Sequence, residues 1–179
     1  MQKGRITMII WINGPYGIGK SALTAALQNH LQESFIFDAE RLGDAIRENM
    51  PGSFFRETFE EYPLWLETCQ SLLKALSQDY SGHVLIPMTL IRPGSVAAIV
   101  DRLKAQQVDI AHVMLEASHE TVRQRILARG EEEDCWCMAQ IDRCLEAQRE
   151  MTCDQRLWTE GKNPEELARE LLGRLGIPQ

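Results

Sequence analysis

The sequence predicts a three-layer α/β fold, in which helices cover both faces of a five-stranded parallel sheet with strand order 2-3-1-4-5. The first supporting observation is an almost wholly apolar run at residues 6–12, typical of a central parallel strand that is buried on both faces. The second is the alternation of short apolar runs with helical patterns. The third is a glycine-rich turn between the first strand and the first helix. We expect residues 1–179 to form a single domain.

Five apolar runs are expected to form the strands. Pro87 cannot donate a backbone hydrogen bond, so regular pairing of the third strand should end there. Right-handed crossover connections then leave few arrangements for the five strands. The expected strands span residues 6–12, 34–38, 83–89, 110–116 and 156–159.

Helical patterns with apolar stripes connect these runs. Ser118 is the expected N-cap of the helix after the fourth strand. Asn163, Pro164 and Glu166 have the spacing of an N-cap, a first-turn proline and a capping box for the last helix. The expected helices span about 20–32, 41–50, 58–80, 93–103, 120–128, 139–151 and 164–175, and the acidic stretch 130–137 is expected to be a loop.

Composition limits the classes of function. Net charge is −7, with 44% hydrophobic and 25% charged residues, as in an ordinary soluble globular protein. We expect no nucleic-acid partner, because duplex binding needs a basic surface. No apolar stretch has the length of a membrane span, so membrane association is not expected. No feature of the sequence indicates an oligomeric state.

The cysteines indicate a reducing compartment. Their number, five, is odd and their spacing shows no disulfide framework, so we expect reduced thiols and a cytoplasmic protein. The pair Cys135-x-Cys137, with Cys144 and Cys153, matches no established zinc-binding pattern.

The glycine-rich turn has the pattern of a phosphate-binding loop. Gly14, Gly19, Lys20 and Ser21 fit G-x-x-x-x-G-K-[ST] between a strand and a helix, as the pattern requires. Glycines let several N–H groups approach one phosphate, the lysine supplies charge, and the serine hydroxyl can bind Mg²⁺. The expected cofactors are therefore ATP and Mg²⁺. The expected nucleotide-binding residues are Gly14, Tyr16, Gly17, Ile18, Gly19, Lys20, Ser21, Ala22, Arg125 and Arg129.

Asp38 is the best sequence candidate to guide the nucleophile. It ends the second strand, beside the phosphate loop in such a sheet, where it could accept a hydroxyl proton or help Ser21 to hold Mg²⁺. Glu40 could share the metal role. The alternative is that Asp38 only caps the next helix. The usual metal-binding acid after a middle strand is missing, and Thr89 stands there either to bond a metal-bound water or to cap the strand.

Positive charge for the transferred phosphoryl group is expected from a lid at about residues 129–140. Arg125 and Arg129 are four residues apart and so share one helix face before the lid. The expected catalytic residues are accordingly Lys20, Asp38 and Arg125. The alternative is a solvated surface on which arginines pair with the abundant nearby carboxylates.

The acceptor is expected to bind to a helical insertion at about residues 40–80. Arginines there could hold an anion, and aromatic side chains could stack on a base. Alternatively, Tyr62 and Trp65 belong to the core. The expected substrate-binding residues are Asp38, Arg41, Arg47, Tyr62, Trp65, Thr89 and Arg143.

Five short segments of the sequence resemble segments of one protein family. They are MIIWING at residues 8–14, YPLW at 62–65, PMT at 87–89, ASHET at 117–121 and QIDRC at 140–144. Together they resemble the bacterial tunicamycin-resistance ATP-binding family over nearly the whole chain. The strand order, insertion and lid resemble the wider nucleoside-monophosphate kinase and shikimate kinase group of P-loop proteins. The resemblance implies ATP binding and resistance to a uridine-containing antibiotic, with phosphorylation as the expected means.

Three functions are consistent with these features. The first is an ATP- and Mg²⁺-dependent kinase acting on a hydroxyl of a nucleoside-like acceptor, tunicamycin being one candidate. The second is a non-catalytic ATP-binding protein that sequesters the antibiotic, which the missing metal-binding acid keeps open. The third is a kinase of a cellular metabolite. A mass gain of one phosphate on the acceptor distinguishes catalysis from binding.

Overall fold

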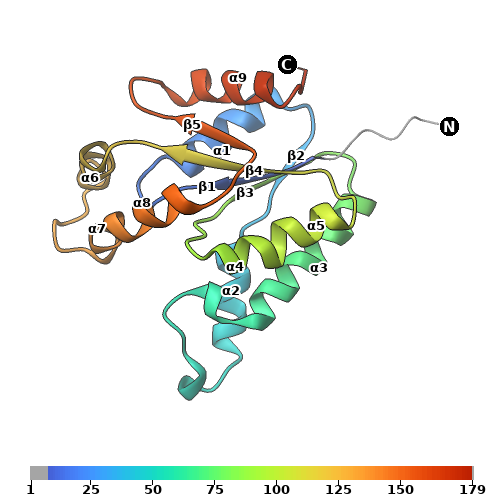
Figure 1. The fold of residues 1–179 in the computed structure, drawn as a ribbon, viewed down its shortest axis with the longest axis horizontal. Coiled ribbons are helices and arrows are strands. Elements are labelled where there is room, and N and C mark those ends of the chain that lie inside the picture. The colour runs from blue at the N-terminus through green and yellow to red at the C-terminus, as the bar shows by residue number, and fades with distance from the viewer. Residues whose placement is uncertain (1–7, 179) are drawn as a thin grey trace.

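A five-stranded parallel sheet forms the centre of the protein, as seen in a computed structural model that describes residues 8–178 (Figure 1). The strand order is β2-β3-β1-β4-β5, as the sequence predicts. Residues 6 and 7 of the expected first strand lie outside the described residues. The strands are β1 (Ile9–Asn13), β2 (Ser34–Ile36), β3 (His83–Pro87), β4 (Ile110–Glu116) and β5 (Gln155–Trp158).

Two hydrophobic clusters, one on each face, bury the sheet. Side chains of β1 alternate between them: Ile10 and Ile12 join one cluster, whereas Ile9 and Trp11 join the other. In Figure 1, α1 (Lys20–His30) and α9 (Pro164–Arg174) cover the first face. The opposite face is covered by α3 (Pro63–Asp79), α4 (Pro93–Val96), a π-helical turn (Ala97–Asp101) and α5 (Arg102–Ala105).

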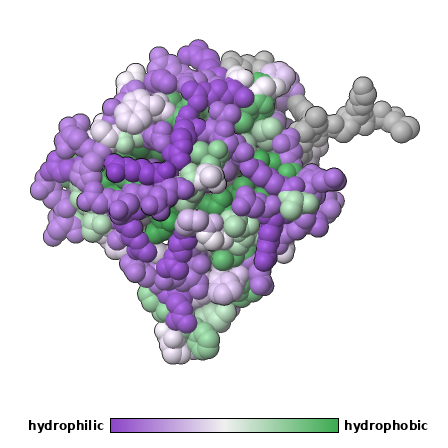
Figure 2. Space-filling model, viewed as in Figure 1, coloured by the Kyte–Doolittle hydropathy of each residue, from purple (hydrophilic) through white to green (hydrophobic). Residues whose placement is uncertain are grey.

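The insertion between β2 and β3 departs from the sequence expectation. After α2 (Ala39–Glu48) come two 3₁₀ turns, Gly52–Phe54 and Phe59–Glu61, and α3 begins only at Pro63. Pro63 takes the first helical position because it has no N–H group to donate to a preceding turn. The expected helix 58–80 therefore starts five residues late. Figure 2 shows pale and green atoms at the tip that this segment forms, consistent with the exposed aromatic rings of Phe54 and Phe55.

The acidic loop expected at residues 130–137 is shorter in the structure. It follows α6 (His119–Leu127), whose N-cap Ser118 accepts a hydrogen bond from the Thr121 N–H at 3.3 Å. A short helix, α7 (Trp136–Ala139), replaces the end of the expected loop and leads into α8 (Ile141–Glu150). Asn163 caps α9 with a bond of 2.9 Å from the Glu166 N–H, in the predicted capping box. Within residues 8–178, no helix combines the length and apolar character needed to cross a membrane.

Candidate active site

The phosphate-binding loop connects β1 to α1 at the carboxyl edge of the sheet. Gly17 and Gly19 have positive φ angles of 82° and 110°, which side chains other than glycine adopt with strain. A Cβ atom on Gly17 would lie 2.5 Å from Cγ1 of Ile126, so this glycine lets the loop pack against α6. A Cβ on Gly19 would meet no atom within 4 Å, because Gly19 opens on a cavity. The loop is thus packed on one side and accessible on the other.

Lys20 holds the loop together through its ammonium group. The Nζ atom donates to the carbonyl oxygens of Gly14 at 2.9 Å and Pro15 at 3.0 Å, and to Oγ1 of Thr89 at 2.8 Å. Loss of hydration lowers the pKa of Lys20 to about 8, with only partial compensation from the nearby charge of Glu40. An anion that binds in front of the loop would therefore favour the charged form of Lys20.

The segment after β3 fixes the base of the loop. Asn13 Oδ1 accepts hydrogen bonds from the Gly14 N–H at 2.8 Å and the Leu90 N–H at 2.9 Å. Thr89 Oγ1 donates to the Gly14 carbonyl at 2.8 Å while it accepts from Lys20. From its position in the sequence, Thr89 is expected either to bond a metal-bound water or to cap the strand. In the structure, its hydroxyl instead contacts the Gly14 carbonyl and the Lys20 ammonium group.

A first cavity of about 410 Å³ opens in front of the loop; we call it the nucleotide cavity. Four residues expected to bind nucleotide do not line it: Gly14, Ile18, Ala22 and Arg125. Its lining residues are Tyr16, Gly17, Gly19, Lys20, Ser21, Thr24, Ile36, Asp38, Glu40, Pro87, Ile126, Arg129, Glu131 and Cys137.

Asp38 caps α2, as one of the two alternatives from the sequence has it, and also lines the nucleotide cavity. Its Oδ1 atom caps α2 by accepting from the N–H groups of Glu40 at 3.1 Å and Arg41 at 3.0 Å. The side chain nevertheless is exposed in the nucleotide cavity, facing the same space as Lys20 and Ser21. Because both cap bonds use one oxygen, the cap is compatible with contacts of the second oxygen to a ligand. The capping bonds hold the carboxylate in place.

A second cavity of about 230 Å³ lies beside the first; we call it the acceptor cavity. Tyr16 and Glu40 line both cavities. Burial raises the pKa of Glu40, against the opposing effect of the Lys20 charge. A carboxylate with a raised pKa at the junction of two cavities has the properties of a general base. The lining residues are Tyr16, Glu40, Arg47, Glu57, Thr58, Phe59, Glu60, Met88, Thr89, Ile91, Trp136, Gln140 and Cys144.

Glu60 is a site residue that the sequence did not reveal. Its buried carboxylate accepts from the backbone N–H groups of Ile91 at 3.2 Å and Arg92 at 3.0 Å. Burial raises its pKa, and these hydrogen bonds oppose the shift. Glu60 thereby ties the insertion to the segment after β3. No motif marks it in the sequence, because its partners are more than thirty positions away.

Arg47 and Thr89 are the two expected substrate-binding residues that line the acceptor cavity. The Nη2 atom of Arg47 donates to the carbonyl oxygens of Arg56 and Glu57, each at 2.9 Å. The guanidinium lies 4.0 Å from the ring centroid of Phe59 and 5.1 Å from that of Phe55. Its Nε atom is buried and has no hydrogen-bond partner among residues 8–178. Arg47 thus holds the segment between α2 and α3 through its Nη2 atom and two aromatic rings, and its Nε atom remains an unpaired donor.

Tyr62 and Trp65 belong to the core rather than to a ligand site, which corrects the expectation that they bind acceptor. Trp65 is 0% exposed, and its Nε1 donates to the Ala39 carbonyl at 2.9 Å. Tyr62 is 6% exposed, and its hydroxyl accepts from the Arg56 N–H at 2.8 Å. Neither side chain lines a cavity described above. Their aromatic bulk packs α3 against the sheet.

Of the two arginines expected to contact the phosphates, Arg125 differs from expectation and Arg129 does not. Arg125 donates to the carbonyl of Ile18 at 2.8 Å and to the Oγ1 and carbonyl oxygens of Thr159 at 2.8 and 3.0 Å. It therefore joins the loop to the end of β5 and does not line the nucleotide cavity, whereas Arg129 does. Arg41 and Arg143 are exposed and line neither cavity.

The fold and this loop define a class of protein, the P-loop kinases, whose fold implies ATP and Mg²⁺ binding in general. Residues 9–151 match the profile of the AAA domain family, and the chain belongs to that family. No curated protein sequence matches the chain.

Solved structures agree with this class. The chain is similar to the tunicamycin resistance protein of Deinococcus radiodurans, with 25% identity, a TM-score of 0.80 and 96% coverage of each chain. The resemblance drawn from the sequence is thereby confirmed. A gluconokinase from Sinorhizobium meliloti 1021 has 18% identity and a TM-score of 0.65, covering 96% of this chain and 93% of its own. A shikimate kinase from Bacteroides thetaiotaomicron has 17% identity and a TM-score of 0.62, covering 95% of this chain and 99% of its own.

Proposed function

We propose that this protein is an ATP- and Mg²⁺-dependent kinase that phosphorylates a hydroxyl of a nucleoside-like acceptor, with tunicamycin as the first candidate. The observation that carries the proposal is the junction of the two cavities. Tyr16 and Glu40 line both, and a 2.8 Å hydrogen bond joins Lys20 of the nucleotide cavity to Thr89 of the acceptor cavity. A donor phosphate at Lys20 and an acceptor at Thr89 would be adjacent.

The nucleotide cavity supplies the donor half. The residues fit a triphosphate, because Gly19 leaves open space in front of the loop and the Lys20 charge is poorly hydrated. Ser21 and Asp38 would hold Mg²⁺, which when bound neutralises phosphate charge. Arg129, exposed in the same cavity, would add positive charge from the lid. Arg125 has the positioning role of holding the loop at Ile18.

The acceptor cavity supplies the other half. Arg47 has an unpaired donor, Nε, and burying such a donor costs free energy that an acceptor oxygen would offset. The flanking ring of Phe59 offers a flat apolar contact suited to a base or sugar face. Glu60 lines the same cavity and contributes a hydrogen-bond acceptor, whereas Arg47 contributes a donor. A polar, partly planar molecule such as a nucleoside suits this mixture.

Two carboxylates are placed to guide the hydroxyl. In the reaction, the acceptor oxygen bonds to the γ-phosphorus, the bond to the departing ADP breaks, and the hydroxyl proton passes to a carboxylate. Asp38 is fixed by its capping bonds, and Glu40 lies at the junction with a raised pKa. We propose Asp38 as the group that orients or deprotonates the hydroxyl, with Glu40 assisting.

Mass spectrometry tests the proposal. The full chain is incubated with ATP, Mg²⁺ and tunicamycin, and then with a panel of nucleosides and sugars in place of the drug. The expected result is an acceptor whose mass increases by one phosphate. Stoichiometric drug binding without modified product would instead favour a sequestering protein, and product formed only with a cellular metabolite would favour a metabolite kinase.

A further inference from the structure

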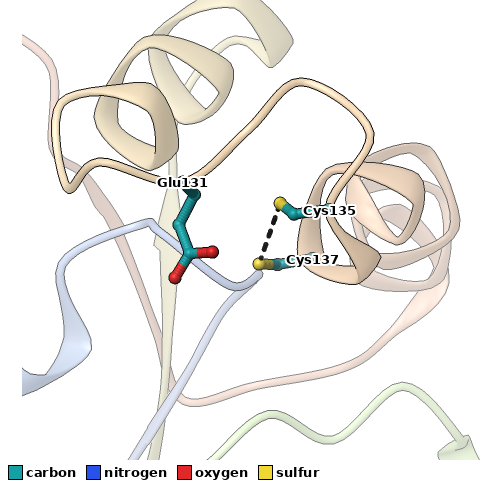
Figure 3. A group of neighbouring side chains, drawn as sticks. All are labelled: Glu131, Cys135 and Cys137. Carbon is teal, nitrogen blue, oxygen red and sulfur yellow. Dashed lines mark hydrogen bonds between the residues drawn. The ribbon is translucent and has the colours of Figure 1, made fainter.

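The lid contains a group of three potential metal ligands with no part in the proposed phosphoryl transfer. Glu131, Cys135 and Cys137 come from the loop after α6 and the beginning of α7, and Figure 3 shows them facing one another. The two sulfur atoms are 3.3 Å apart, and the three ligand atoms all lie within 4.8 Å of one another. The cysteines are half-buried, and the glutamate is exposed.

We propose that these three residues form a binding site for a single thiophilic divalent cation of the Zn²⁺ class. Zn²⁺ binds cysteine sulfur at about 2.3 Å and carboxylate oxygen at about 2.0–2.2 Å, so two sulfurs of one tetrahedral site lie roughly 3.8 Å apart. The observed 3.3 Å between the sulfurs is close to that separation. With all three ligand atoms within 4.8 Å of one another, one ion could contact all of them.

The donor set and its position distinguish this group from a chance acidic cluster. Two thiolates favour Zn²⁺ over Mg²⁺, which prefers oxygen ligands in an octahedral arrangement. Three protein ligands leave a fourth position for water or another oxygen. Because Glu131 and Cys137 also line the nucleotide cavity, the ion would lie at its rim. The chelate would close the loop from Glu131 to Cys135 and order the lid.

Sequence spacing alone does not reveal this arrangement. The pair Cys135-x-Cys137 has no second pair at zinc-finger distance, and Cys144 and Cys153 are not in the group. The third ligand comes from the acidic stretch before the cysteines, where a turn brings Glu131 back toward them (Figure 3).

Metal titration of the reduced full chain tests the site. The protein is kept with a non-thiol reductant, and intact mass confirms free thiols. Zn²⁺ affinity is measured by competition with a chromophoric chelator, and Cd²⁺ is added separately to detect a thiolate-to-metal absorption band. We expect one ion per chain. The variants Cys135→Ser, Cys137→Ser and Glu131→Gln should each bind at least about 10-fold more weakly.

Two variants outside the three-residue group serve as matched controls. Glu132→Gln changes a neighbouring exposed carboxylate, and Cys153→Ser removes a thiol outside the group. Both should bind within about twofold of the unchanged chain. Absence of stoichiometric binding, or equal affinity in Cys137→Ser, would overturn the proposal. An unchanged affinity in the exposed variant Glu131→Gln would remove the carboxylate and overturn the three-ligand site, without any question of folding.

Discussion

The nucleotide cavity and the acceptor cavity share two side chains but are built in different ways. Five of the fourteen residues that line the first come from one short segment, Tyr16 to Ser21, which connects β1 to the start of α1. The second collects side chains from the loop, α2, the 3₁₀ segment, the segment after β3, the lid and α8. A contiguous motif can be recognised in a sequence, whereas a dispersed pocket depends on tertiary packing. The donor half of the site is therefore the half that the sequence describes best.

The largest expected effect concerns Asp38, at the edge of the donor half. Asp38→Asn should lower turnover by about 10²–10⁴-fold, because an amide cannot accept the hydroxyl proton. Folding should be nearly unchanged, since asparagine caps a helix as well as aspartate does. ATP should still bind, because the amide keeps an oxygen that can face Mg²⁺ and the loop is intact. Steady-state kinetics and nucleotide titration measure the two quantities. Retained turnover in this variant would remove Asp38 from the mechanism.

Arg47 tests the acceptor half separately. Arg47→Met should raise KM for the acceptor about 10-fold, because it removes the donor and releases the carbonyls of Arg56 and Glu57. The Kd for ATP should be unchanged, since Arg47 does not line the nucleotide cavity. The exposed Arg41→Met, on the same helix and outside both cavities, is the matched control. Equal effects on donor and acceptor would contradict the division into two cavities.

In the donor half, proton uptake on ATP binding should depend on pH because of Lys20. Its pKa of about 8 makes it largely neutral at pH 8.5, and bound phosphates should restore the charge. ATP binding should then take up as much as roughly three quarters of a proton at pH 8.5, and almost none below about pH 6.5. Calorimetry in buffers of different ionisation enthalpy measures the uptake. Lys20→Arg keeps its charge and should show none; equal uptake in that variant would assign the proton elsewhere.

Trp65→Phe tests whether Trp65 belongs to the core or to the acceptor site. Trp65→Phe should cost about 1–2 kcal/mol of unfolding free energy, because it removes packing volume and the bond to the Ala39 carbonyl. Denaturant unfolding measures this loss. KM for the acceptor should stay within about twofold. A large rise in KM for the acceptor with an unchanged free energy of unfolding would instead indicate that Trp65 contributes to the acceptor site.

The elements that sequence predicts well are those with strong local signals. The apolar β1, the glycine loop and the capping box of α9 each depend on neighbouring residues, and the strand order follows from general rules of connection. The 3₁₀ segment between α2 and α3 was missed because its apolar residues resemble a helix, whereas Pro63 delays the helical start. The late start of α3 is thus a local effect of Pro63.

Site residues divide in the same way. Lys20, Ser21 and Asp38 were expected, and the structure gathers them in one cavity. Glu60 was not expected, because its partners at Ile91 and Arg92 are set by folding. Arg125 has the right position in the chain for a phosphate contact, yet acceptors on Ile18 and Thr159 occupy its guanidinium. Charge patterns indicate which arginines are near a site but not which oxygens they bind.

A crystal structure of the protein with a non-hydrolysable ATP analogue, Mg²⁺ and the acceptor found by mass spectrometry would show directly whether the two substrates meet at Glu40. We expect phosphates against Gly19 and Lys20, the acceptor between Arg47 and Glu60, and the acceptor hydroxyl facing the terminal phosphate beside Glu40 and Asp38. A nucleotide and an acceptor bound in separate cavities that do not meet at Glu40 would contradict this expectation.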